Sequence, residues 1–207
     1  SFYPSKNLGA FGDGGLITTN NDEMAAKLKQ MRNHGMNPKY YHKFIGGNFR
    51  LDALQAGVLN VKLNYLDNWH EQRREHAQLY LKYFQEYGLI DINNNKDFAA
   101  SNPLIYPETI YSNSSAKNNH IYNQFTIRAK NRDDLQKFLA SREIGSDIYY
   151  PIPLHKQECF AYLQSKDNDF PITNQISDEV LSLPIFPELQ EEQIKFVAES
   201  IRDFYSK

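Results

Sequence analysis

The sequence predicts a mixed α/β chain that ends in a small α+β domain. Residues 120–129, 131–143 and 146–151 have, in turn, the patterns of a strand, a helix and a strand. A long helical pattern from 51 to about 87 precedes this unit, and an amphipathic helix is predicted at 191–205. Helices that follow and interrupt strands in this order favour an α+β domain at the C-terminal end.

The composition is that of a globular protein and excludes several functional classes. The chain has 207 residues, which allows one or two domains, and its net charge of -2 gives no reason to expect a nucleic-acid partner. No apolar run approaches the roughly 18 residues of a membrane span, so no membrane partner is expected. The single cysteine, Cys159, has no partner for an internal disulfide, which favours a cytoplasmic location.

The first part of the chain predicts a short strand, a helix and a long loop. "GLITT" at 15–19 is the strand, and Asn20 or Asn21 caps the helix that follows it. Gly35 is placed to end this helix. Residues 36–49 then form a loop too long and too aromatic to be a mere connection. The apolar face of the helix would consist of Met24, Leu28 and Met31.

The helical pattern from 51 to about 87 is longer than a typical globular helix, and a kink is expected near Asn64–Asn68. A helix of this length is typical of a connection between two domains. Polar loops are predicted at 92–97 and 112–119. The apolar stripe of the long helix would comprise Leu51, Leu54, Val58, Val61, Tyr65 and Trp69.

Most of the candidate site motifs have structural explanations. The glycine run "GAFGDGG" at 9–15 lacks the Gly-Lys-Ser/Thr of a phosphate-binding loop, so a tight turn with positive φ at several glycines is the favoured interpretation. The six histidines lack the spacing of a metal site, and none is expected. Cys159 lacks a motif that would make it a nucleophile.

Lys6 differs from the other lysines in its surroundings. It stands at the end of a predicted strand, after Phe2 and Tyr3 and before the glycine run. An amine that is desolvated there would have a lowered pKa, and a neutral amine can attack an aldehyde. Lys6 is therefore a candidate for forming an imine, while a solvated surface charge remains the alternative.

Five segments of the chain resemble, in order, the signatures of the DegT/DnrJ/EryC1/StrS family of pyridoxal-phosphate sugar aminotransferases. The resemblance covers nearly the whole chain and implies the C-terminal half of a longer protein. It implies the end of the large domain of a fold type I transferase over 1–50, a connecting helix over 51–88 and a small α+β domain over 89–207. The segments are "SFYPSKNLGAFGDGG", "RNHG", "YYHKFIGGNFRLDALQAGVLNVKL", "IYYPIPLHKQECF" and "LSLPIFPEL".

The resemblance assigns roles to single residues. Lys6 would be the Schiff-base lysine for pyridoxal 5'-phosphate and the general acid and base of the reaction. Ser1 would bind the phosphate of the cofactor. Asn48 would reach the same phosphate from the neighbouring subunit, which implies a homodimer with shared active sites.

Three further residues are implied as substrate contacts: Arg50, Tyr150 and His155. For the last two, a buried tyrosine and a structural histidine are equally good interpretations. The chain departs from the family at Tyr149, where histidine is frequent, and at Gly47, where tyrosine is frequent. These departures leave the role of Tyr149 and the packing of the loop around Gly47 open.

The activity implied is the transfer of an amino group from glutamate to a nucleotide-linked keto-deoxysugar, with 2-oxoglutarate as co-product and pyridoxamine phosphate as the intermediate cofactor form. The product would serve a surface polysaccharide or a glycosylated metabolite. A lysine at position 6 favours amino transfer over dehydration. The alternative is a truncated, non-catalytic or regulatory member of the same fold. In either case the intact protein is expected to contain more than these 207 residues.

Overall fold

The computed structural model describes residues 1–98, 102–109, 111 and 119–206. The chain divides into two compact units, Ser1–Asn68 and Trp69–Lys207. Within the described ranges, no helix is long and apolar enough to cross a membrane. The predicted loop at 112–119 lies almost wholly outside the described residues. The division into a cofactor domain, a connecting helix and a small domain stays a prediction for the intact protein.

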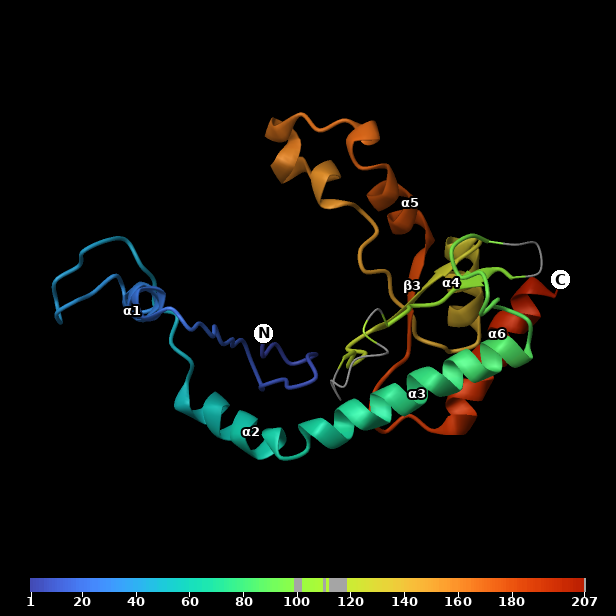
Figure 1. Cartoon of the computed structure of the whole chain (residues 1–207), viewed down its shortest axis with the longest axis horizontal. Helices are drawn as coiled ribbons and strands as arrows, with labels where there is room; N and C mark the ends of the chain where they lie inside the picture. The colour runs from blue at the N-terminus through green and yellow to red at the C-terminus, as the bar shows by residue number, and fades with distance from the viewer. Residues whose placement is uncertain (99–101, 110, 112–118, 207) are drawn as a thin grey trace. The chain divides into compact units, whose positions relative to one another are not determined.

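The first unit contains helix α1 (Asp22–Met31), labelled in Figure 1, which begins at the predicted cap. The Asn21 Oδ1 accepts a hydrogen bond from the Met24 N–H at 2.8 Å, which satisfies one donor of the first turn. Gly35 follows the helix with a φ of +68°, and a Cβ there would lie 1.8 Å from the Phe44 carbonyl oxygen. The turn after α1 therefore requires glycine for two separate reasons.

The strand predicted at 15–19 is wrong, because these residues have no regular secondary structure. A strand exists only through pairing with a neighbour, and no segment of the described chain pairs with this one. Leu16 and Ile17 are each 70% exposed. The apolar face predicted for α1 is likewise not covered, since no residue of this helix is buried.

The long helical pattern is broken where a kink was predicted. Helix α2 (Ala53–Leu63) ends at Asn64, and helix α3 (Leu66–Glu86) begins two residues later. The Asn64 side chain lies 3.4 Å from the Asn60 carbonyl oxygen, a local hydrogen bond that competes with the helix ladder. The predicted apolar stripe is wrong for α2: Leu54 is 86% exposed, and the buried residue of this helix is Leu59.

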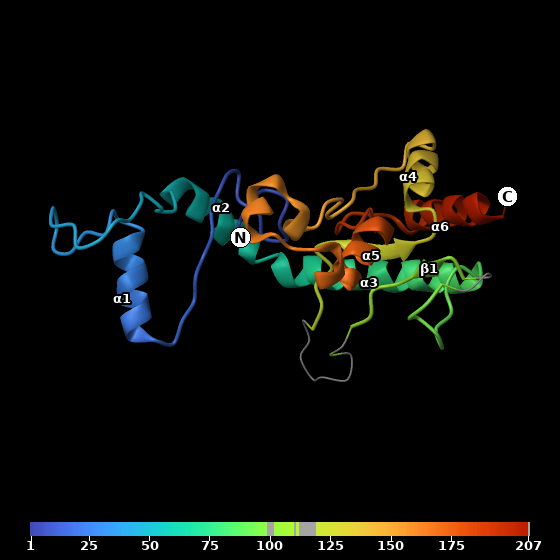
Figure 2. The same ribbon diagram turned by 90° about the horizontal axis from the view of Figure 1, so that it is seen from above.

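The second unit is built on an antiparallel sheet of strands β1 (Leu104–Ile105), β2 (Phe125–Ala129) and β3 (Val180–Leu183), in that order. In the second pair, Phe125 lies opposite Leu183 and Arg128 opposite Val180. Figures 1 and 2 show α3, α4 (Arg132–Ser141) and α6 (Glu191–Tyr205) grouped around this sheet.

Aromatic side chains join α3 to the sheet. The Tyr80 and Phe125 rings stack with their centroids 4.9 Å apart, and both residues are fully buried. The Tyr80 hydroxyl donates to the Pro184 carbonyl oxygen at 2.9 Å, and burial raises its pKa above the ordinary value. The remaining core residues of this unit include Phe84, Ile127, Leu135, Leu139, Leu181, Ile194 and Ile201.

The predicted β-α-β unit is correct only in part. The strand at 120–129 begins at Phe125, five residues late, and no strand forms at 146–151. Of that second segment, Asp147 alone pairs with the sheet, through two backbone hydrogen bonds with Ser182 of 3.1 and 2.7 Å. The helices α4 and α6 are confirmed, and the bounds of α6 agree with the predicted 191–205.

Between Asp147 and β3 the chain leaves the sheet in a helical excursion, defined here as residues 148–179. It extends away from β3 through α5 (Pro171–Glu179) in Figure 1. The sequence analysis did not predict its helices. They are the short 3₁₀ segments η1 (Leu154–Lys156), η2 (Glu158–Leu163) and η3 (Asp167–Asp169), followed by α5.

Candidate functional site

Lys6 lies in a closed loop, defined here as the lysine loop (residues 1–14). The Phe2 N–H donates to the Gly14 carbonyl oxygen at 2.8 Å, and the Lys6 N–H donates to the Tyr3 carbonyl oxygen at 2.9 Å. Lys6 therefore stands in a turn and not at the end of a strand, which corrects the sequence-based expectation. Its side chain is exposed, so the desolvated surroundings expected from the sequence are not found in the described chain, where its amine has no hydrogen bond or ion pair.

The glycines of the lysine loop allow close approach and do not adopt a left-handed backbone. Among the described residues, positive φ occurs in glycine only at Gly35 and Gly88, so the predicted positive φ in the 9–15 run is wrong. A Cβ on Gly9 would lie 2.3 Å from the Pro4 carbonyl oxygen. Glycine is needed there because the loop folds back on its own backbone.

Helix α2 supports the lysine loop with two side chains that the sequence analysis did not single out. The Gln55 Oε1 accepts from the Phe11 N–H at 2.8 Å, and the Lys62 Nζ donates to the Gly9 carbonyl oxygen. Gln55 and Lys62 are seven residues apart and so lie on one face of α2. Two polar residues at this spacing, on a helix whose other residues are apolar except Asn60, were the available signal.

Asn48 and Arg50 are exposed neighbours in the same unit as Lys6. The Arg50 Nε donates to the Asn48 Oδ1 at 3.0 Å. The backbone at Asn48 is held by a bridge to Asn33, just beyond α1. Because its oxygen is engaged by Arg50, the Asn48 amide keeps its Nδ2 as a donor, and this nitrogen has no partner within the described ranges.

The departure from the family at Gly47 has a local explanation. A Cβ added at Gly47 would lie 2.3 Å from the Phe49 ring, so that ring occupies the space beside the glycine. A tyrosine at this position would require Phe49 to move. Ser1, at the start of the lysine loop, accepts at its Oγ from the Tyr3 N–H at 3.3 Å.

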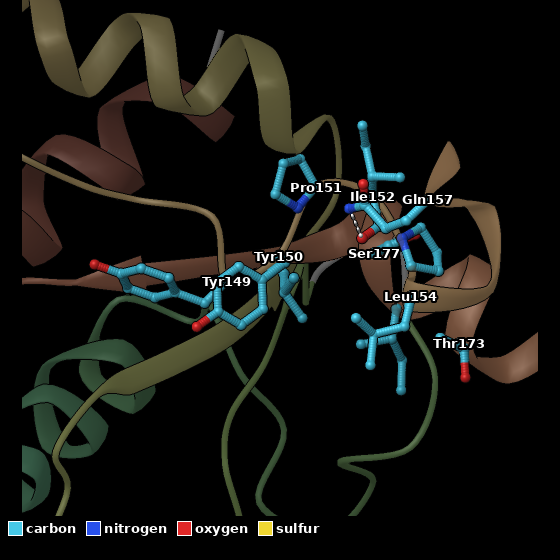
Figure 3. Close-up of a pocket in the computed structure, with 11 residues that line it drawn as sticks. Tyr149, Tyr150, Pro151, Ile152, Leu154, Gln157, Thr173 and Ser177 are labelled. Atoms are coloured by element: carbon cyan, nitrogen blue, oxygen red, sulfur yellow. Dashed lines mark hydrogen bonds between the residues drawn. The ribbon is translucent and has the colours of Figure 1, made fainter. Parts of the chain in front are cut away.

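Tyr150 and His155 belong to the second unit and have different surroundings. Tyr150 is 72% exposed and lines a cavity of about 460 Å³, defined here as the aromatic pocket (Figure 3). His155 does not line it; its ring packs against Phe170 at 4.7 Å between centroids. The other residues of the aromatic pocket are Tyr149, Pro151, Ile152, Pro153, Leu154, Gln157, Thr173, Ile176, Ser177 and Val180.

The donor set of the first unit fits an aldehyde coenzyme that carries a phosphate. Such a coenzyme needs an accessible amine for its aldehyde, which Lys6 supplies, and N–H or O–H donors for its phosphate. The Ser1 hydroxyl and the Asn48 amide are donors of this kind, and the Arg50 guanidinium adds positive charge beside Asn48. All four residues belong to the first unit, and the described hydrogen bond among them joins Arg50 to Asn48.

Solved structures define the class to which this fold belongs. The chain matches the crystal structure of DesV from S. venezuelae, described as a complex with a ketimine intermediate, with a TM-score of 0.84 and 33% identity. The match covers 100% of this chain and 50% of the DesV chain. The fold is thus that of the fold type I aminotransferases, which confirms the predicted class at this level.

Residues 1–202 match the DegT/DnrJ/EryC1/StrS aminotransferase family, and the chain belongs to it. A relative from Geobacillus stearothermophilus, named "Pleiotropic regulatory protein", is 45% identical over 99% of this chain and 50% of its own length. The dTDP-3-amino-3,6-dideoxy-alpha-D-galactopyranose transaminase of Aneurinibacillus thermoaerophilus is 41% identical over 99% of this chain and 55% of its own length. The chain spans about half the length of the curated relatives it matches.

Proposed function

We propose that the intact protein is a pyridoxal-phosphate aminotransferase that moves the amino group of glutamate to a nucleotide-linked keto-deoxysugar. The observation that carries the proposal is the exposed amine of Lys6, which has no protein partner in the described chain, in a loop braced by Gln55 and Lys62. An amine held in a fixed loop but free of ion pairs is suited to covalent attachment. The name of the Aneurinibacillus relative supports a nucleotide sugar as acceptor.

The coenzyme, when bound, supplies the electron sink for the reaction. Lys6 would be the group that holds the coenzyme through its aldehyde, and its amine would carry a proton to and from the substrate carbon. A proton is transferred efficiently only over hydrogen-bond distance, so the position of the lysine loop matters for this transfer. Gln55 and Lys62 would restrict the positions that the Lys6 backbone can adopt.

Ser1 and Asn48 would hold the phosphate end, and Arg50, which the resemblance implies as a substrate contact, would orient the Asn48 amide. The bond from Arg50 fixes the orientation of the Asn48 amide, so that Nδ2 and not Oδ1 is presented to an anion. The guanidinium would attract the same anion. The exposed Cys159 is compatible with the cytoplasmic location that we propose for the reaction.

A screen of keto-sugar nucleotides tests the proposed function directly. The intact protein, loaded with coenzyme, should form 2-oxoglutarate from glutamate only when a suitable keto-sugar nucleotide is present. The panel should vary the position of the keto group and the nucleotide independently. Absence of turnover with every member, in a preparation that binds the coenzyme, would contradict an aminotransferase.

We further propose a homodimer in which Asn48 of one subunit completes the site that contains Lys6 of the other. Mixing two inactive variants, Lys6→Ala and Asn48→Asp, should then restore activity. Each hybrid dimer has one site with both changes and one with neither, so random reassortment should give about a quarter of wild-type turnover. If both residues act within one subunit, the mixture should stay inactive, which would contradict shared sites.

The regulatory alternative has one observation in its favour, the name of the Geobacillus relative. A regulatory member of the fold would not need a lysine amine that forms a covalent bond with the coenzyme. Treatment of the coenzyme-loaded protein with borohydride separates the two functions: an aminotransferase should carry the reduced coenzyme on Lys6. A protein that binds coenzyme but leaves Lys6 unmodified would support the regulatory function.

A further inference from the structure

The glycine run of the lysine loop lies along helix α2. The Lys62 Nζ donates to the Gly9 carbonyl oxygen, and the Gln55 Oε1 accepts from the Phe11 N–H at 2.8 Å. The loop therefore passes the helix in the opposite direction, since its earlier residue contacts the later residue of α2. Both contacts end on backbone atoms of the loop, so they fix the course of the chain and not the side chains that it carries.

Glycine allows this close approach at two further positions. A Cβ on Gly12 would lie 3.1 Å from the Gln55 Nε2. A Cβ on Gly14 would lie 2.9 Å from the Cδ1 of Leu51, which precedes α2 by two residues. A side chain at either position would push against these neighbours, so the glycines let the loop backbone lie close to the helix.

The part of the loop that contacts α2 also holds the part that does not. We call residues 1–3 the first leg of the lysine loop and residues 9–14 the second leg. Two backbone hydrogen bonds of 2.8 Å join the legs: the Phe2 N–H donates to the Gly14 carbonyl oxygen, and the Ala10 N–H donates to the Phe2 carbonyl oxygen. Attachment of the second leg to α2 therefore also restrains the first leg and the turn between the two.

Ser1 and Lys6 lie in the parts of the loop that are restrained in this indirect way. Ser1 begins the first leg, and Lys6 lies in the turn, where its N–H donates to the Tyr3 carbonyl oxygen at 2.9 Å. Under the proposed function, these two residues meet opposite ends of the coenzyme, the phosphate and the aldehyde. A molecule of fixed length reaches both residues only if the loop keeps them at one separation.

From these contacts we infer that Gln55 and Lys62 are positioning residues, which hold Lys6 and Ser1 at the separation that the coenzyme requires. Their polar atoms bond to the loop backbone, so they act through the loop. The bond from Lys62 is charge-assisted and is the stronger of the two by its chemistry. This inference rests on the proposed function and extends it from the residues that would contact the coenzyme to the helix that supports them.

Hydrogen exchange of the coenzyme-free intact protein tests the support from α2 by itself. Gln55→Leu and Lys62→Met should each raise the exchange rate of a peptide that covers the lysine loop about tenfold, because each removes one hydrogen bond. The matched controls Asn60→Leu and Lys27→Met make the same chemical changes at exposed side chains of the first unit and should change the rate less than about twofold. Exchange at the parent rate in Gln55→Leu and Lys62→Met would overturn the inference.

Borohydride trapping of the coenzyme tests the positioning role. The coenzyme concentration that gives half-maximal labelling of Lys6 should rise about tenfold in Gln55→Leu and Lys62→Met. Gln55→Glu keeps an acceptor for the Phe11 N–H, and Lys62→Arg keeps a donor for the Gly9 carbonyl oxygen, so both should stay within about threefold of the parent value. If these conservative variants were as impaired as the first pair, the hydrogen bonds would not be the cause, and the inference would be wrong.

Turnover at saturating coenzyme separates positioning from substrate binding. Gln55→Leu and Lys62→Met should lower kcat and leave the KM for the keto-sugar nucleotide unchanged, because the misplaced group would be the amine of Lys6 and not a substrate contact. A raised KM with a normal kcat would assign the two residues to substrate binding and overturn the positioning role.

Failure of this inference can be distinguished from failure of the proposed function. If the parent protein never carries coenzyme on Lys6, the proposed function is wrong, and hydrogen exchange still decides whether α2 supports the loop. If the parent is labelled and active, and Gln55→Leu and Lys62→Met are labelled at the same coenzyme concentration, the aminotransferase stands and the positioning role is wrong. Circular dichroism of each variant excludes a loss of folding, and if Lys62→Met does not fold, Gln55→Leu alone decides.

Discussion

Lys6→Ala is expected to lower glutamate-dependent turnover by about 10³-fold or more, because it would remove both the proposed point of covalent attachment and the proposed proton carrier. The expectation follows from the amine's exposed position in the lysine loop, where no described residue pairs with it. The measurement is the rate of 2-oxoglutarate formation with a saturating keto-sugar nucleotide. Borohydride treatment followed by peptide mapping should find the reduced coenzyme on Lys6 in the parent protein and on no residue of the variant.

The control for this variant is Lys27→Ala, which removes another exposed lysine of the same unit, from the middle of α1. It should leave turnover within about twofold of the parent value, since exposed surface substitutions have small effects. Normal turnover by Lys6→Ala would remove the basis of the proposed mechanism. A reduced rate in both variants would indicate a general loss of positive charge and not the loss of a specific amine.

Arg73→Met is expected to lower the free energy of unfolding by about 3 kcal/mol, because buried carbonyl oxygens would lose their donor. Arg73 is 9% exposed, and its Nη1 donates to the carbonyl oxygens of Tyr122 at 3.0 Å and Ile185 at 2.8 Å. Burial lowers the pKa of its guanidinium, and the charge of Glu188 opposes that shift. Urea unfolding, followed by far-ultraviolet circular dichroism, gives the change.

Lys137→Met is the comparison for Arg73→Met, since it also removes a cation from a helix of the second unit. Lys137 and Asp134 form an exposed pair at 3.3 Å on α4, and such pairs contribute less than about 1 kcal/mol. A loss of stability in Arg73→Met no larger than in this variant would show that the three-way contact of Arg73 contributes little.

The elements predicted correctly from the sequence are those whose signals are local. The helix cap at Asn21 and the helical spacing of apolar residues in α6 depend on residues close together in the sequence. They can therefore be predicted without knowing the rest of the fold. Strands depend on distant partners, and the segment at 15–19 has none in the described chain. Strand β3 escaped prediction because its four residues are all buried, so no alternation marks it.

The residues of the candidate site that lie in a sequence motif could be predicted. The contacts that form only when distant segments fold together could not. Lys6, Ser1 and Asn48 come from the family resemblance, and their roles stay predictions. The contact of Gln55 with the lysine loop spans 44 positions in the sequence, so no local pattern could reveal it. The same holds for Asn123 and Ser146, which line one cavity because β2 pairs with β3 and Asp147 pairs with Ser182.

The helical excursion departs from the sheet just after Asp147 and returns at Val180, and the Asp147–Ser182 bridge closes its base. Its two ends are therefore fixed by backbone hydrogen bonds that do not depend on the side chains between them. A segment anchored in this way can change its side chains without changing the strand pairing at its base. Segment 148–179 could therefore be replaced as a unit while the sheet and Lys6 remain unchanged.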